Sequence, residues 1–179
     1  MRNLVSVAAI GLAGLLSACF MSETPFVPDA DLVSLPDENV RFCTDEDDCA
    51  DASLAEDGSY ILMPPPEEDD APVPIRLAAL TQNDLGRIWL AEIPIEEDDE
   101  TVYTVGVVRR APEFDTGLPG YEIALPDCHE FTPEEAEAYG IEKIDKGTCH
   151  VPASMPVAEF LRAAYAERLN DPEWWVGED

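Results

Sequence analysis

The residues best suited to chemistry are two histidines that each directly follow a cysteine. His129 follows Cys128 and His150 follows Cys149, and the chain has no other histidine. Two thiolates and two imidazoles could hold zinc, but zinc sites usually place two cysteines two to four residues apart and two histidines three to five apart. Neighbouring residues on a strand also point to opposite faces. The spacing therefore argues against a metal site, and His129 with His150 is kept only as an alternative metal pair.

Motifs for the common catalytic chemistries do not occur in the chain. No serine stands in a Gly-x-Ser-x-Gly elbow. There is no phosphate-binding loop and no dinucleotide fingerprint. We therefore expect no enzyme and no cofactor. A small hydrolase remains an alternative, which would need a pocket with a serine or paired carboxylates beside His129 or His150.

Three acidic clusters lie at residues 45–48, 67–70 and 96–100. An EF-hand calcium loop needs acids at alternate positions and a glycine at the sixth. Counting from Asp45, the fifth and sixth positions are Cys49 and Ala50, so the motif fails. We interpret the clusters as solvated loop tips. Weak collective binding of divalent cations is the alternative if the loops converge.

The charge balance is strongly acidic. The 179 residues include 39 acidic and 10 basic residues, for a net charge of −29. Nucleic acids and anionic lipid surfaces repel such a chain. The charge is compatible with a cationic protein or divalent cations as partners, and it also suits a protein adapted to a salty medium, where salt screens the self-repulsion.

The N-terminus has the pattern of a signal peptide. A short segment with one positive charge, residues 1–3, precedes the apolar residues 4–16. An apolar run of this length is too short to cross a bilayer, which takes about 20 residues, but it suits the apolar region of a signal peptide. The sequence Leu16-Ser17-Ala18-Cys19 follows, and it resembles the lipobox of bacterial lipoproteins.

The resemblance implies that signal peptidase cuts after Ala18 and that Cys19 carries diacylglycerol and an acylated N-terminus. Two or more acyl chains hold a protein stably on a membrane. The residue after the cysteine is Phe20 rather than aspartate, which by analogy favours the outer membrane over the inner one. The expected location is the cell envelope, with the lipid-anchored chain facing the periplasm.

With Cys19 assigned to lipid, four cysteines remain, an even number that in an exported chain indicates disulfides. Four cysteines allow three connectivities. We expect the sequence-local one, Cys43–Cys49 and Cys128–Cys149. On the chain-entropy model, these bridges would contribute about 2.4 and about 3.4 kcal/mol of stability.

The chain divides into four parts. Residues 1–18 are the expected signal peptide, and residues 19–37, rich in proline and acids, are expected to form a flexible acylated tether. One α+β domain is expected over residues 38–170. Residues 171–179 read as a tail that contains Trp174 and Trp175.

Short runs of apolar, β-branched and aromatic residues between turn formers predict strands. The expected fold is an antiparallel sheet or a small barrel-like meander of five to seven strands with two helices near the C-terminus. The predicted strands are 40–43, 59–63, 75–80, 87–93, 101–109 and 121–125, with one or two more within 141–151.

Two helices are predicted in the C-terminal third. Thr132 is an N-cap followed by Pro133 at the first helical position, and Gly140 suits the end of that helix. Apolar residues within 157–169 recur at helical spacing. Trp174 and Trp175 form a pair that more often covers the edge of its own core than binds a ligand.

The expected function is that of a non-enzymatic envelope lipoprotein with a structural or binding role. The pattern is similar to that of small bacterial envelope lipoproteins that end in a strand, a cysteine and a short helix. This similarity implies no particular activity. The alternative is an inhibitor or binder of a cationic envelope protein, by analogy of size, location and charge with lipoprotein-type lysozyme inhibitors, whose motifs are absent. Such a binder would capture a basic protein at low ionic strength and release it in salt.

Overall fold

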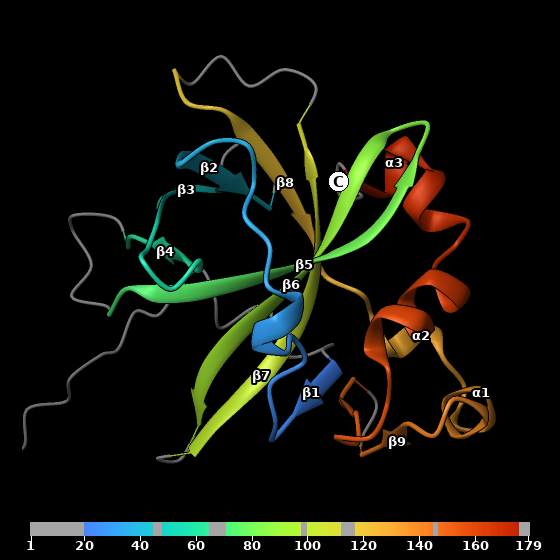
Figure 1. Cartoon of the computed structure of the whole chain (residues 1–179). Coiled ribbons are helices and arrows are strands. Elements are labelled where there is room, and N and C mark those ends of the chain that lie inside the picture. Colours follow the sequence, from blue (N-terminus) through green and yellow to red (C-terminus); the bar gives the residue numbers. More distant parts are fainter. Residues whose placement is uncertain are drawn as a thin grey trace, which may run out of the picture.

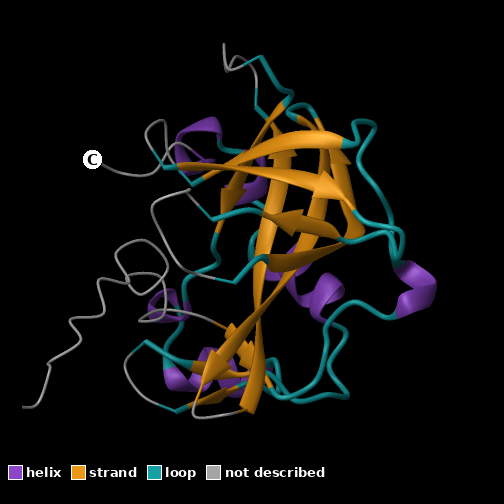
Figure 2. Cartoon of the chain, turned by 90° about the vertical axis from the view of Figure 1, so that its left-hand side faces the viewer, coloured by secondary structure: helices purple, strands orange, loops and turns teal. Residues whose placement is uncertain are grey.

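Seven strands close into a barrel in the computed structural model (Figures 1 and 2). The structure describes residues 20–44, 48–64, 71–97, 100–111, 117–144 and 147–175. Around the barrel the strands hydrogen-bond in the order β6-β5-β4-β3-β2-β8-β7, and β7 pairs again with β6. In chain order they are β2 (Asn39–Cys43), β3 (Cys49–Leu54), β4 (Tyr60–Leu62), β5 (Val73–Asn83), β6 (Gly86–Glu97), β7 (Glu100–Arg110) and β8 (Gly120–Ala124).

The interior of the barrel is filled by side chains from every strand. Successive residues of a strand point to opposite faces, so that Val40 and Phe42 of β2 and Trp89 and Ala91 of β6 point inward. A barrel of about this many strands is just narrow enough for side chains to fill it. The other buried members of this inner core are Leu35, Ala52, Tyr60, Ile75, Leu77, Val108, Tyr121 and Ile123.

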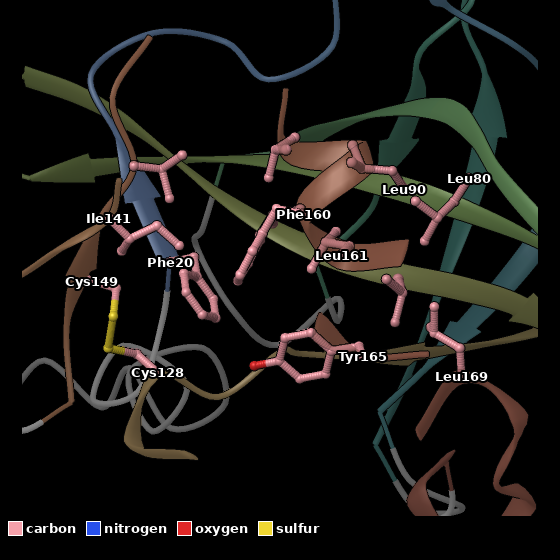
Figure 3. Close-up of a cluster of buried hydrophobic side chains, with 14 of the residues drawn as sticks. Phe20, Leu80, Leu90, Cys128, Ile141, Cys149, Phe160, Leu161, Tyr165 and Leu169 are labelled. Atoms are coloured by element: carbon pink, nitrogen blue, oxygen red, sulfur yellow. A yellow bond between two sulfur atoms is a disulfide. The ribbon is translucent and has the colours of Figure 1, made fainter. Parts of the chain in front are cut away.

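A second core lies on the outside of the barrel, between strands β5–β7 and the C-terminal third of the chain (Figure 3). Strands β6 and β7 are therefore buried on both faces over residues 88–92 and 104–109. The covering elements are η3 (Cys128–Glu130), α1 (Pro133–Ala138), α2 (Val157–Ala164), η4 (Arg168–Asn170) and α3 (Pro172–Trp175). The predicted Thr132 cap forms: the Thr132 hydroxyl accepts from the Glu135 N–H, and the Thr132 N–H donates to the Glu135 carboxylate.

Strands β6 and β7 run on beyond the barrel, and three short strands extend the same sheet from the edge of β7. One edge of β7 has two partners along its length. It pairs with β8 over Val107–Arg110 and with β1 at Tyr103 and Thr104. From β1 the sheet continues to β10 and then to β9. These strands are β1 (Phe20–Ser22), β9 (Glu142–Lys143) and β10 (Cys149–His150).

Residues 20–37 belong to the fold, whereas a flexible tether was expected for residues 19–37. Phe20 is fully buried in the outer core. The helical turn η2 (Asp29–Asp31) follows, and the Val33 N–H then donates to the carbonyl of Leu77 on β5. The apolar residues of this segment have no regular spacing because they reach different surfaces, and for that reason periodicity did not reveal them.

Three further expectations are corrected by the structure. The sheet is mixed rather than antiparallel, because β2 pairs in parallel with β8 to close the barrel, and β1 pairs in parallel with β10. Strand β3 was not predicted, since its sequence has no β-branched or aromatic residue. The expected tail contains helix α3, and Trp175 is buried in the outer core.

Candidate functional site

Both expected cysteine pairs are joined in the structure. Cys43 and Cys49 are direct partners at the end of the β2–β3 ladder, with their Cα atoms 4.1 Å apart. Cys128 and Cys149 have Cα atoms 5.7 Å apart and tie η3 to β10 (Figure 3). Sulfurs that are bonded to each other are not available as thiolate ligands or nucleophiles.

The two histidines lie near this second disulfide, at the surface. The Nδ1 atom of His129 is 3.0 Å from the Asp127 carboxylate, and half of the His129 side chain is exposed. His150 lies opposite Glu142 in the β9–β10 ladder. Within the described ranges, no three or more His, Cys, Asp or Glu side chains are arranged to hold a metal ion. A Cys2His2 site, which the sequence analysis considered and argued against, would need thiolates from Cys128 and Cys149, whose sulfurs are bonded to each other.

A surface depression of about 400 Å³ lies between α1 and β9. Two exposed carboxylates, Glu137 and Glu142, are among its lining residues, which include no serine and no histidine. Glu142 is the ladder partner of His150. The depression therefore brings one carboxylate, that of Glu142, into the neighbourhood of a histidine, and it contains no serine.

A carboxylate that the sequence analysis missed is buried in the wall of the barrel. Glu92 on β6 is 1% exposed. Its Oε2 accepts a hydrogen bond of 2.7 Å from the Val27 N–H, and Arg76 lies 3.4 Å from its Oε1. Arg76 also pairs with Asp29. The signal in the sequence was an acid inside the apolar run 87–93. Glu92 fastens the N-terminal segment to the barrel through the Val27 N–H.

A second buried ion pair lies under the C-terminal helix. Arg109 on β7 and Glu122 on β8 are ladder partners and form a side-chain hydrogen bond. The guanidinium carbon of Arg109 lies 4.7 Å from the centre of the Trp175 ring. Trp175 thus seals this pair from water with its ring, while its own Nε1 has no hydrogen-bond partner among the described residues.

Two buried tyrosines of the barrel, Tyr60 and Tyr121, donate hydrogen bonds to Asp37, which shortly precedes β2. The Tyr60 hydroxyl donates to the Asp37 carbonyl at 2.6 Å, and the Tyr121 hydroxyl donates to the Asp37 carboxylate at 3.0 Å. Burial raises the pKa of Tyr121 well above its usual value, and the hydrogen bond to Asp37 raises it further. Burial likewise raises the pKa of Tyr60 and of Tyr165.

These tyrosines predict a loss of stability in alkali. Above a pH of about 10 the unfolded chain releases phenolic protons that the folded chain keeps, so the free energy of unfolding falls by up to about 1.4 kcal/mol per pH unit for each such tyrosine. Below that pH the stabilisation is fully present. Urea unfolding at a series of pH values should show this slope. Tyr121→Phe should flatten it by one tyrosine's share, because it removes one of the phenols whose pKa burial raises. An equal slope in wild type and Tyr121→Phe would contradict the assignment.

Several predicted features lie outside the described residues. These are the expected signal peptide 1–18, the lipid attachment site Cys19, residues 45–47 and 98–99 of two acidic clusters, and the whole of the third cluster, 67–70. Among the helices that are described, none has the length and apolarity needed to cross a bilayer.

Comparisons with known proteins give no relative for this chain: no protein-family model, no curated protein and no solved structure matches it. Function is therefore argued from the chain itself. The buried charged residues of the described parts, Glu92 and Arg109, have protein partners, and the tyrosines with raised pKa values lie in packed cores. These buried charged residues and tyrosines hold the N-terminal segment, the barrel and the C-terminal helix together.

Proposed function

We propose that the chain is a membrane-anchored lipoprotein of the bacterial cell envelope, held by lipid on Cys19, with a structural or binding role rather than a catalytic one. The observation that carries this proposal is the lipobox-like sequence Leu16-Ser17-Ala18-Cys19, which follows a positively charged start and a short apolar run. The residue after the lipobox cysteine, Phe20, is buried in the outer core.

The disulfides support an exported protein. Cys43–Cys49 and Cys128–Cys149 are both bonded, and disulfides form and persist in oxidising compartments such as the periplasm. Attachment of Cys19 to lipid would leave no free thiol in the chain, which has five cysteines. This division of the cysteines is consistent with a protein that passes through an oxidising envelope.

A binding role fits the acidic surface better than catalysis does. The net charge of −29 attracts cationic proteins over a distance of about a Debye length and more strongly at low salt. The barrel interior is occupied by side chains, so a partner would bind on the outside. Capture of a cationic envelope protein is the second candidate function, and the salt dependence described above distinguishes it from a purely structural role.

Fatty-acid labelling of growing cells tests the anchor. The wild-type chain should incorporate labelled palmitate, and Cys19→Ser should not, because it lacks the sulfur that carries the diacylglycerol. The matched control is the Cys43→Ser/Cys49→Ser double variant, which removes one disulfide but keeps the lipobox and should be labelled like the wild type. Labelling that persists in Cys19→Ser, or that is absent from the wild type, would contradict the proposal.

A further inference from the structure

Cys19, the expected lipid attachment site, directly precedes a buried residue of the fold. Phe20 has no exposed surface, and its ring lies 5.8 Å from that of Phe131 and 5.2 Å from that of Phe160. One peptide unit separates Phe20 from Cys19, and consecutive Cα atoms are about 3.8 Å apart. A lipid on Cys19 would therefore hold the start of β1 within roughly 10 Å of the glycerol group.

The same end of β1 lies beside the hairpin of β9 and β10. Because β1 and β10 are parallel, with Phe20 opposite Cys149, the residues before these two positions leave the sheet on the same side. Thr148 immediately precedes Cys149, and its carbonyl accepts a hydrogen bond of 2.9 Å from the Ile144 N–H across the hairpin. Ile144 thus lies at the side of the domain where the chain enters.

This side carries exposed apolar side chains. Ile144 is 61% exposed and Tyr139 is 40% exposed, and with Met63 they are the exposed large hydrophobic residues of the described chain. Tyr139 follows α1, and its ring packs 6.3 Å from that of Phe131, next to Phe20. We call Tyr139 and Ile144 the hairpin face. Met63 follows β4, which Figure 1 shows on the opposite side of the molecule from β9.

We propose that the hairpin face rests directly on the lipid surface that holds Cys19, with Ile144 among the headgroups and Tyr139 at their level. The proposal rests on the acylation of Cys19 proposed above. The headgroup region adds roughly 5–8 Å to each side of the hydrocarbon core. This depth is comparable with the distance between the start of β1 and the glycerol group on Cys19, which are joined by one peptide unit and the cysteine side chain. Tyrosine suits this layer, because its ring is apolar and its hydroxyl is polar.

The charge of the chain decides which lipids it can rest on. With a net charge of −29, the domain is repelled by anionic headgroups at a range of about 8 Å in physiological salt. The hairpin face therefore fits a zwitterionic surface. The lipid anchor supplies the affinity, and the hairpin face sets the orientation of the domain.

The accessibility of spin labels tests this orientation. The labelled protein is the whole processed chain, acylated at Cys19 and reconstituted in phosphatidylcholine vesicles. Ile144→Cys carries one label, and the matched control Met63→Cys carries it at a similarly exposed apolar residue on the barrel. The Ile144→Cys label should be accessible to membrane-soluble oxygen and protected from a water-soluble nickel chelate. The Met63→Cys label should show the reverse.

Mass spectrometry of the same samples distinguishes a failure of the docking proposal from a failure of the proposed anchor. If Cys19 is acylated and both labels are equally accessible to the chelate, the docking proposal is wrong while the proposed anchor stands. If the mass shows an unmodified Cys19, the anchor is wrong and the docking falls with it. Circular dichroism of both labelled variants should match the wild type, and the Met63→Cys control guards against an effect of labelling alone.

Discussion

Phe20→Ala should lower the free energy of unfolding by about 3–5 kcal/mol, the usual cost of removing a buried phenylalanine side chain. The ring of Phe20 meets those of Phe131, Phe160 and Tyr165 in the outer core. For a protein of this size the loss corresponds to a fall in melting temperature of roughly 6–20 °C. Urea unfolding of the purified protein, followed by circular dichroism, measures it.

The matched control for this prediction is Phe26→Ala. Phe26 lies in the same N-terminal segment and is only partly buried against the same core, so its truncation should cost clearly less. The comparison decides between the packed segment and the flexible tether that the sequence suggested for residues 19–37. Equal and small effects of the two substitutions would mean that β1 does not contribute to the stability of the domain.

Arg109→Met should destabilise the protein by about 3–5 kcal/mol, because it leaves the carboxylate of Glu122 buried without its partner. The side chains of Arg109 and Glu122 are 6% and 12% exposed. The variant also loses the stacking of the guanidinium on Trp175. Denaturant unfolding gives the size of the effect, and the fluorescence of the tryptophans should change as Trp175 is loosened.

Two further variants show that the effect comes from the uncompensated charge. Arg109→Met/Glu122→Leu replaces the pair by apolar side chains of similar volume and should recover most of the lost stability. Arg41→Met breaks the exposed Arg41–Asp51 pair, whose side chains are 29% and 51% exposed, and should cost less than about 1 kcal/mol. A double variant less stable than Arg109→Met would contradict this explanation.

Local signals predicted many of the elements. The apolar runs 75–80 and 87–93 predicted two strands, and these became β5 and β6, which pair in an antiparallel ladder that ends at Asn83 and Gly86. Thr132 and Pro133 predicted the start of α1. The helical stripe within 157–169 became α2 and η4, with its apolar residues in the outer core. Each of these features depends on residues that are close in the sequence.

The features that the sequence did not reveal depend on distant partners. Pairing of β2 with β8 brings Arg41 opposite Gly120, and no local pattern encodes such a closure. Strand β1 has three residues, too few for a period, and is fixed by contacts with residues more than 80 positions away, such as Thr104. The burial of Glu92 depends on the Val27 N–H, a partner that lies 65 positions away in the sequence.

The candidate site follows the same division. The two disulfides could be predicted because each pair is local in the sequence. The sequence could not show that the hairpin face lies near Phe20, because this arrangement arises from the parallel pairing of Phe20 with Cys149, which are 129 residues apart. Exposure of Ile144 is likewise a property of the folded hairpin.

The most direct test of the account is the mass of the N-terminal peptide from protein extracted from the membrane fraction. The account predicts a peptide that begins at Cys19 and carries the mass of a diacylglyceryl group and an N-linked acyl chain. A peptide that begins at Met1, with an unmodified Cys19, on a soluble protein inside the cell would contradict it.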